Sequence, residues 1–198
     1  MLKHAPKALL WLALASPLAW LIWQVAIEIQ APTTALGADP GEAIVHFLGE
    51  WAIRILLLAF SVTPVFHLTR LVWIASARRL VGLWAFTYVV LHLLAYLFFY
   101  IEFSWSAAME DVVKRSYITA GFLAFVCLIP MALTSTAAMR RRLGKTWRQI
   151  HQLVYVALAA GLVHLFWLTR DGYTEVVVYL AWFILLVGYR RYKVKLKR

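Results

Sequence analysis

The stretch that decides the fold class runs from Leu80 to Ile101 and reads LVGLWAFTYVVLHLLAYLFFYI. It contains no Asp, Glu, Lys or Arg. The hydrocarbon core of a bilayer is about 30 Å thick and an α-helix rises about 1.5 Å per residue, so about 20 mostly apolar residues cross it. The stretch meets this requirement. We therefore expect a membrane-spanning helix here, with one histidine, His92, inside it.

The rest of the chain repeats this character. Hydrophobic residues make up 64% of the sequence and charged residues 15%, against about 45–50% and about 25% in soluble domains. Apolar windows of spanning length cover residues 8–27, 44–66, 80–101, 117–133, 150–168 and 174–189. We predict an all-α integral membrane protein, a bundle of six transmembrane helices forming a single domain over residues 1–198. The connecting segments 28–43 and 102–116 are expected to be loops.

The basic residues predict the orientation of the bundle. Of the 20 Lys and Arg residues, sixteen fall in the two termini and in loops 67–79 and 134–149, whereas three fall in the other loops and Arg54 lies in the second window. Basic loops of membrane proteins face the cytoplasm. We therefore expect cytoplasmic termini in a bacterial inner membrane. Anionic lipid headgroups then account for the net charge of +11, so no nucleic-acid partner is expected.

Three histidines lie in windows 80–101 and 150–168: His92 in the first, and His151 and His164 in the second. An ionisable residue inside a membrane is costly and marks a functional site by default. Imidazole is a common axial ligand of haem iron, and helix bundles hold cofactors between facing helices. A histidine that merely bonds a neighbouring helix is the alternative interpretation of each. Three histidines on two helices favour b-type haem, one or two per chain, with these residues as iron ligands.

Depth along the helices predicts which histidines pair. By helix rise, His92 lies about 18 Å from the cytoplasmic start of its window, and His164 about 21 Å from the start of window 150–168. Because these depths agree, the two histidines are expected to share one haem in the outer half of the membrane.

His151 is expected to serve a second, inner haem. It precedes His164 by thirteen residues, which separates the two by about 140° around an ideal helix. A π-bulge between them would bring both onto one face. His67 lies at the level of a missing inner ligand, but a solvated histidine at a helix end is the default for His67, and a surface histidine for His46.

Three arginines are candidate ligands for a haem propionate or a flavin phosphate: Arg54, Arg78 and Arg79. Glu50 and Arg54 are four residues apart in the order that favours a helical ion pair. They either neutralise each other inside the membrane, or leave Arg54 to bind the cofactor. For Arg78 and Arg79 the alternative is a role in topology and lipid contact.

The sequence contains no Gly-rich dinucleotide fingerprint, no Walker loop and no HExxH motif, and no internal repeat is evident. Such a chain fits an electron-transfer subunit without catalytic residues of its own, supplied by quinol or by a separate reductase. A self-standing ferric or quinone reductase is one alternative. A non-redox six-helix transporter or assembly protein is another.

Several segments closely resemble the MsrQ (YedZ) family, and more distantly the ferric reductases and NADPH oxidases. They are Leu36–Pro40, His46–Gly49, Arg78–Trp84 with His92, Thr134–Thr136, and Leu143–His151 with Tyr155 and His164. The resemblance covers about residues 10–190 in order.

The resemblance implies a ferric reductase-like haem domain with haem b on His92, His151 and His164, and FMN as a further cofactor. It also implies electrons from the quinone pool and a heterodimer with a periplasmic molybdopterin-containing methionine sulfoxide reductase that repairs oxidised proteins. Complementary charge speeds association, so we expect that partner to dock on the acidic outer residues Asp39, Glu42, Glu110 and Asp111.

Overall fold

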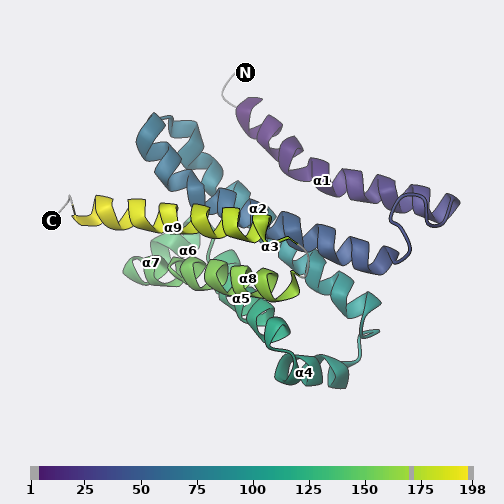
Figure 1. The fold of residues 1–198 in the computed structure, drawn as a ribbon. Coiled ribbons are helices and arrows are strands. Elements are labelled where there is room, and N and C mark those ends of the chain that lie inside the picture. Colours follow the sequence, from purple (N-terminus) through teal and green to yellow (C-terminus); the bar gives the residue numbers. More distant parts are fainter. Residues whose placement is uncertain (1–4, 170–171, 196–198) are drawn as a thin grey trace.

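A computed structural model describes residues 5–169 and 172–195, and over that part of the chain all regular structure is helical (Figure 1). The helices are α1 Ala5–Gln30, α2 Pro40–Thr69, α3 Val72–Phe99, α4 Trp105–Lys114, α5 Ser116–Leu133, α6 Ala137–Leu143, α7 Lys145–His151, α8 Leu153–Leu168 and α9 Thr174–Lys195. The predicted all-α class is confirmed.

Among the described residues, five helical segments are long and apolar enough to cross a membrane. They are α1 from Lys7, α2, α3, α5, and the segment Lys145–Leu168 that joins α7 to α8. The last helix, α9, is 22 residues long and carries charged residues near both ends, including Glu175 and Arg190. The sixth span, expected over residues 174–189, stays a prediction.

Capping and short amphipathic segments explain where the helices depart from the apolar windows. α2 begins before residue 44 because the Asp39 side chain accepts the backbone N–H of Glu42 at 2.9 Å and Pro40 starts the first turn. Segment 102–116, expected to be a loop, contains α4. That helix begins where Ser104 accepts the N–H of Ala107. A ten-residue helix is too short to show as an apolar window.

The α2 helix forms the centre of the bundle. In its spanning window 44% of the residues are buried, against 17–28% in the other four spans. It packs most closely against α3, and it also contacts α1, α8 and α9. The second close pair is α5 with α8. The core therefore consists of two antiparallel hairpins, α2–α3 and α5–α8, which contact each other through α3 with α5 and α2 with α8.

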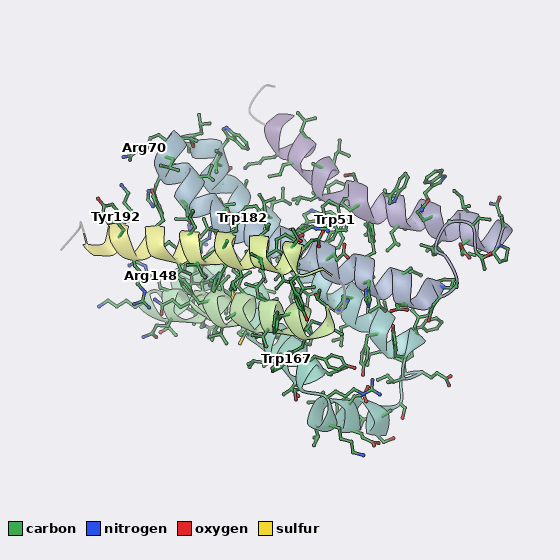
Figure 2. The ribbon with its side chains drawn as sticks, viewed as in Figure 1. Trp51, Arg70, Arg148, Trp167, Trp182 and Tyr192 are labelled. Carbon is green, nitrogen blue, oxygen red and sulfur yellow. The ribbon has the colours of Figure 1, made fainter. Side chains whose placement is uncertain are left out.

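The basic segments gather at one end of the molecule. Figure 2 shows Arg70, Arg148 and Tyr192 on the left, whereas Trp51 and Trp167 lie away from that end. We call this the basic end; it comprises the α2–α3 turn, α6, α7 and the last turns of α9 (Figure 1). Loop 31–39 and α4 lie toward the other end, called here the opposite end.

Candidate functional site

His92 and His164 meet between the two hairpins, near the opposite end. His92 comes from α3 and His164 from α8. Their ring centres are 6.2 Å apart and the ring planes are inclined by 76°. The two histidines, which were expected to lie at the same depth, are therefore close together in the structure.

The two rings are anchored in the same way. Nδ1 of His92 lies 2.9 Å from the carbonyl oxygen of Val45 on α2. Nδ1 of His164 lies 2.6 Å from the carbonyl oxygen of Tyr117 on α5. Because a carbonyl can only accept, each Nδ1 carries the proton and donates it. Each Nε2 is then unprotonated, which is the form that binds a metal.

This arrangement fits haem. Two neutral imidazoles from facing helices, each with an unprotonated Nε2, are the donors that haem iron would take as axial ligands. Among the described residues no group of three or more His, Cys, Asp or Glu side chains could hold a bare metal ion. Two protein ligands suit an iron whose other positions a macrocycle fills.

His151 lies at the basic end, apart from this pair. Its ring stacks on Trp147 with centres 4.0 Å apart, and its Nε2 lies 3.3 Å from Thr134 Oγ1. The Thr134 hydroxyl donates to the carbonyl of Pro130 at 2.7 Å, so it accepts from His151. In this arrangement Nδ1, rather than Nε2, is the unprotonated nitrogen of His151.

The predicted π-bulge between His151 and His164 is replaced by a break. The helix is interrupted at Gln152, between α7 and α8. The N–H of Tyr155 bonds the Gln152 carbonyl at 3.0 Å, which is the tighter i→i+3 pattern. Thirteen steps of about 100° leave the two histidines about 140° short of one face. A tighter turn adds rotation per residue and reduces this gap, whereas a bulge removes rotation.

The other two histidines in the described part of the chain agree with their default interpretations. His46 is exposed, and its Nε2 lies 3.9 Å from a carboxylate oxygen of Glu42. His67 lies in the last turn of α2, half-buried beside Phe66.

Arg54 is already engaged by protein groups. Its Nη2 lies 3.0 Å from Glu50 and 3.3 Å from Glu175, and its Nε donates to the Tyr179 hydroxyl at 2.7 Å. It thereby ties α2 to α9 and has two carboxylates to neutralise it. The expected ion pair between Glu50 and Arg54 is present, and binding of Arg54 to a propionate or a flavin phosphate would require these contacts to break.

Arg78 and Arg79 are exposed near the start of α3. By helix rise they lie about 20 Å from His92. They therefore cannot reach a propionate of a haem held by the His92–His164 pair, and remain candidates only for an inner site.

Arg190 makes a specific contact in the core, although its position among the C-terminal basic residues predicted only a role in orienting the chain in the membrane. Its Nη2 donates to the carbonyl of Phe60 at 2.6 Å, and its guanidinium lies 4.0 Å from the centre of the Phe60 ring. The Phe60 carbonyl is available because residue 64 is proline, which has no N–H to donate. Pro64 was the sequence signal for this contact. A proline inside a helix leaves the carbonyl four residues earlier, here that of Phe60, without its usual N–H donor.

Comparisons with known proteins identify the family of the chain. The family model for the ferric reductase like transmembrane component matches residues 48–162. A protein-methionine-sulfoxide reductase heme-binding subunit MsrQ from Xanthomonas campestris pv. campestris (strain 8004) is 39% identical over 189 residues, which cover 96% of this chain and 87% of the relative. No solved structure matches.

A relative from another organism gives the same result. The MsrQ heme-binding subunit of Caulobacter vibrioides is 38% identical over 183 residues, covering 92% of this chain and 84% of the relative. Both the Xanthomonas and the Caulobacter alignments span nearly the whole chain. The chain therefore belongs to the MsrQ family of heme-binding subunits, and it is a multi-pass membrane protein with a ferric reductase-like transmembrane component.

Proposed function

We propose that this chain binds haem b between His92 and His164 and carries electrons across the membrane to a periplasmic methionine sulfoxide reductase. The observation that carries the proposal is the pair of imidazoles, one from each hairpin, anchored through Nδ1 with ring centres 6.2 Å apart. Bound haem supplies a one-electron couple in its iron. The alternative of a transporter or assembly protein leaves the matched anchoring of the two rings unexplained.

The residues around the pair perform definite tasks. The carbonyls of Val45 and Tyr117 fix the tautomer and the orientation of the rings and raise the basicity of each Nε2. The α2–α3 and α5–α8 hairpins exclude water, because apolar side chains cover them. His151, beside Trp147 and Thr134, is proposed as a ligand of a second haem near the basic end, where Arg78 and Arg79 would meet its propionates.

FMN is implied by the family resemblance, but none of the described residues is proposed here to bind it. Arg54 already bonds two carboxylates and a tyrosine, so a flavin phosphate there would have to displace them. We assign no residue to FMN. The proposed electron source is the quinone pool, since the described residues include no strand from which a nicotinamide-binding domain is built.

We further propose six spans with both termini in the cytoplasm and the His92–His164 pair near the periplasmic face. The gathering of Arg70, Arg148 and the last turns of α9 at one end supports this orientation. The sixth span would be α9, whose central part from Val176 to Tyr189 carries no charged residue.

Reporter fusions test this orientation. Alkaline phosphatase fused after Arg198 is expected to be inactive, because the enzyme folds only in the periplasm, whereas a fusion in segment 102–116 is expected to be active. A green fluorescent protein fusion at the same two sites should give the reverse pattern and serves as the control. An active phosphatase after Arg198 would invert the molecule and exclude electron delivery to the periplasm.

We propose that a periplasmic partner docks on only part of the acidic outer surface. Glu110 pairs with Lys114 at 2.6 Å, and Asp111 pairs with Arg115 at 3.0 Å. These two carboxylates are therefore largely neutralised. Among the described residues, no Lys or Arg pairs with Asp39 or Glu42, and Glu42 lies 3.9 Å from His46.

Asp39 and Glu42 line a pocket of about 510 Å³ together with Phe99 and Tyr100. Gly41 forms part of the wall of this pocket. Val45, whose carbonyl anchors His92, lies one helical turn after Gly41 on α2. We propose this acidic pocket as the docking surface.

Neutralising the pocket should slow electron transfer to the partner. The double variant Asp39→Asn, Glu42→Gln keeps an N-cap side chain at residue 39 and removes two negative charges. We expect a lower transfer rate at low ionic strength and an unchanged haem spectrum, with the difference disappearing at high salt.

The matched control is the double variant Glu110→Gln, Lys114→Gln, which removes an ion pair on the same side without changing the net charge. It should behave like the unmodified protein. Equal rates for the acidic-pocket variant and the control at low salt would refute this docking surface.

A further inference from the structure

Each imidazole of the pair rests on a glycine of the neighbouring helix. A Cβ atom added to Gly49 would lie 2.9 Å from Cε1 and 3.0 Å from Nδ1 of His92. A Cβ added to Gly121 would lie 2.9 Å from Nδ1 and 3.0 Å from Cε1 of His164. Real Cβ atoms essentially never show contacts under 3.0 Å, so a side chain at either position would require the ring to move.

The glycines stand in one fixed relation to the carbonyls that anchor the rings. Gly49 follows Val45 by four residues, and Gly121 follows Tyr117 by four residues. Four residues are about one helical turn, so carbonyl and glycine lie on the same face of their helix. In both hairpins the histidine follows the carbonyl residue by 47 positions.

The two groups of three residues are thus copies of one arrangement. The steps from Val45 to Tyr117, from Gly49 to Gly121 and from His92 to His164 are each 72 residues. Each group joins the first helix of a hairpin to the second, α2 to α3 and α5 to α8. The sequence showed no repeat because the residues between these positions differ; only the atoms that touch the rings recur.

We infer that the site is a duplicated half-site in which Gly49 and Gly121 are positioning residues, each setting the orientation of one iron-ligating imidazole by allowing it to lie against helix backbone. The inference rests on the proposed function, since it assumes haem between the two rings. It also accounts for the lone inner histidine. The same step of 72 residues places Arg79 opposite His151, so the duplicated pattern supplies no second imidazole at the basic end.

A competing explanation is that the glycines only let two helices approach closely, as small residues do in membranes. The atoms that lie nearest to Gly49 and Gly121 contradict this explanation. The three atoms nearest to the added Cβ are imidazole atoms at both Gly49 and Gly121. By contrast, the atom that an added Cβ at Gly161 would meet is Cδ1 of Ile53, at 3.3 Å.

The test uses Gly49→Ala and Gly121→Ala in the purified full-length protein. Each should retain haem about 10–100-fold less tightly, as is typical when an outer partner of a metal ligand is changed. The haem that remains should show shifted low-spin electron paramagnetic resonance g-values and a shifted midpoint potential, because these report ring orientation. The control is Gly82→Ala on α3, where an added Cβ meets no atom within 4 Å; it should match the unmodified protein.

A second background separates ring displacement from helix packing. In a His92→Ala protein the ring is absent, so adding Gly49→Ala should change neither its yield nor its thermal stability. This comparison also applies if Gly49→Ala alone fails to accumulate. Full haem retention with unshifted spectra and potential in both alanine variants would overturn the inference, and so would an equal loss of stability in the His92→Ala background. Haem retention in His92→Ala itself would instead refute the proposed function.

Discussion

Replacing either His92 or His164 with alanine is expected to remove the same haem. One iron held by two imidazoles is expected to lose its low-spin state when either imidazole is missing. We expect the low-spin signal of this haem to fall to background in both variants and the haem-to-protein ratio to fall equally. The measurement is the dithionite-reduced spectrum together with haem per polypeptide after purification.

Two variants control this experiment. His46→Ala removes an exposed histidine near the same end and should leave the spectrum unchanged. His151→Ala should leave the signal of the His92–His164 pair intact, and loss of a separate haem signal would assign His151 to an inner site. Full haem retention in either His92→Ala or His164→Ala would remove the pair as the binding site.

The second large effect concerns electron delivery. Membranes that contain the unmodified chain should reduce a methionine sulfoxide substrate through the purified periplasmic partner when quinol is the only donor. Membranes with His164→Ala should do so no faster than membranes without the chain, since the electron path across the bilayer has lost its haem. The measurement is the rate of sulfoxide reduction.

A donor that bypasses the membrane provides the control. Reduced viologen should drive the partner equally well with either membrane preparation, which shows that the partner itself is intact. If unmodified membranes reduced ferric iron rapidly with quinol but never passed electrons to the partner, the chain would be a self-standing reductase rather than a subunit.

The helices of the core were predictable because lipid imposes one requirement along the whole chain. Every backbone N–H and C=O in the hydrocarbon must be bonded within the segment, so an apolar run of sufficient length is a helix. Windows 80–101 and 117–133 lie within α3 and α5, apart from two residues at the end of the first. This argument does not predict short helices such as α4 and α6, because neither needs to cross the membrane.

The pairing of His92 with His164 was also predictable, since depth depends only on residue number and helix rise. The full set of contacts made by Arg54 was not predictable. Its neutralisation depends on Glu175 and Tyr179, which lie more than 120 residues away in the sequence. A helical ion pair with Glu50 could be foreseen from spacing, but the second carboxylate could not.

The sequence by itself determined the membrane class, the family and the histidines at matching depth, because composition, apolar length and residue spacing are local properties of the chain. Only the tertiary structure decided how each imidazole is held. Nδ1 of His92 meets the carbonyl of Val45 and lies against Gly49, and the same contacts recur 72 residues later. Such contacts depend on the rotation and close approach of two packed helices, which no pattern within either helix specifies.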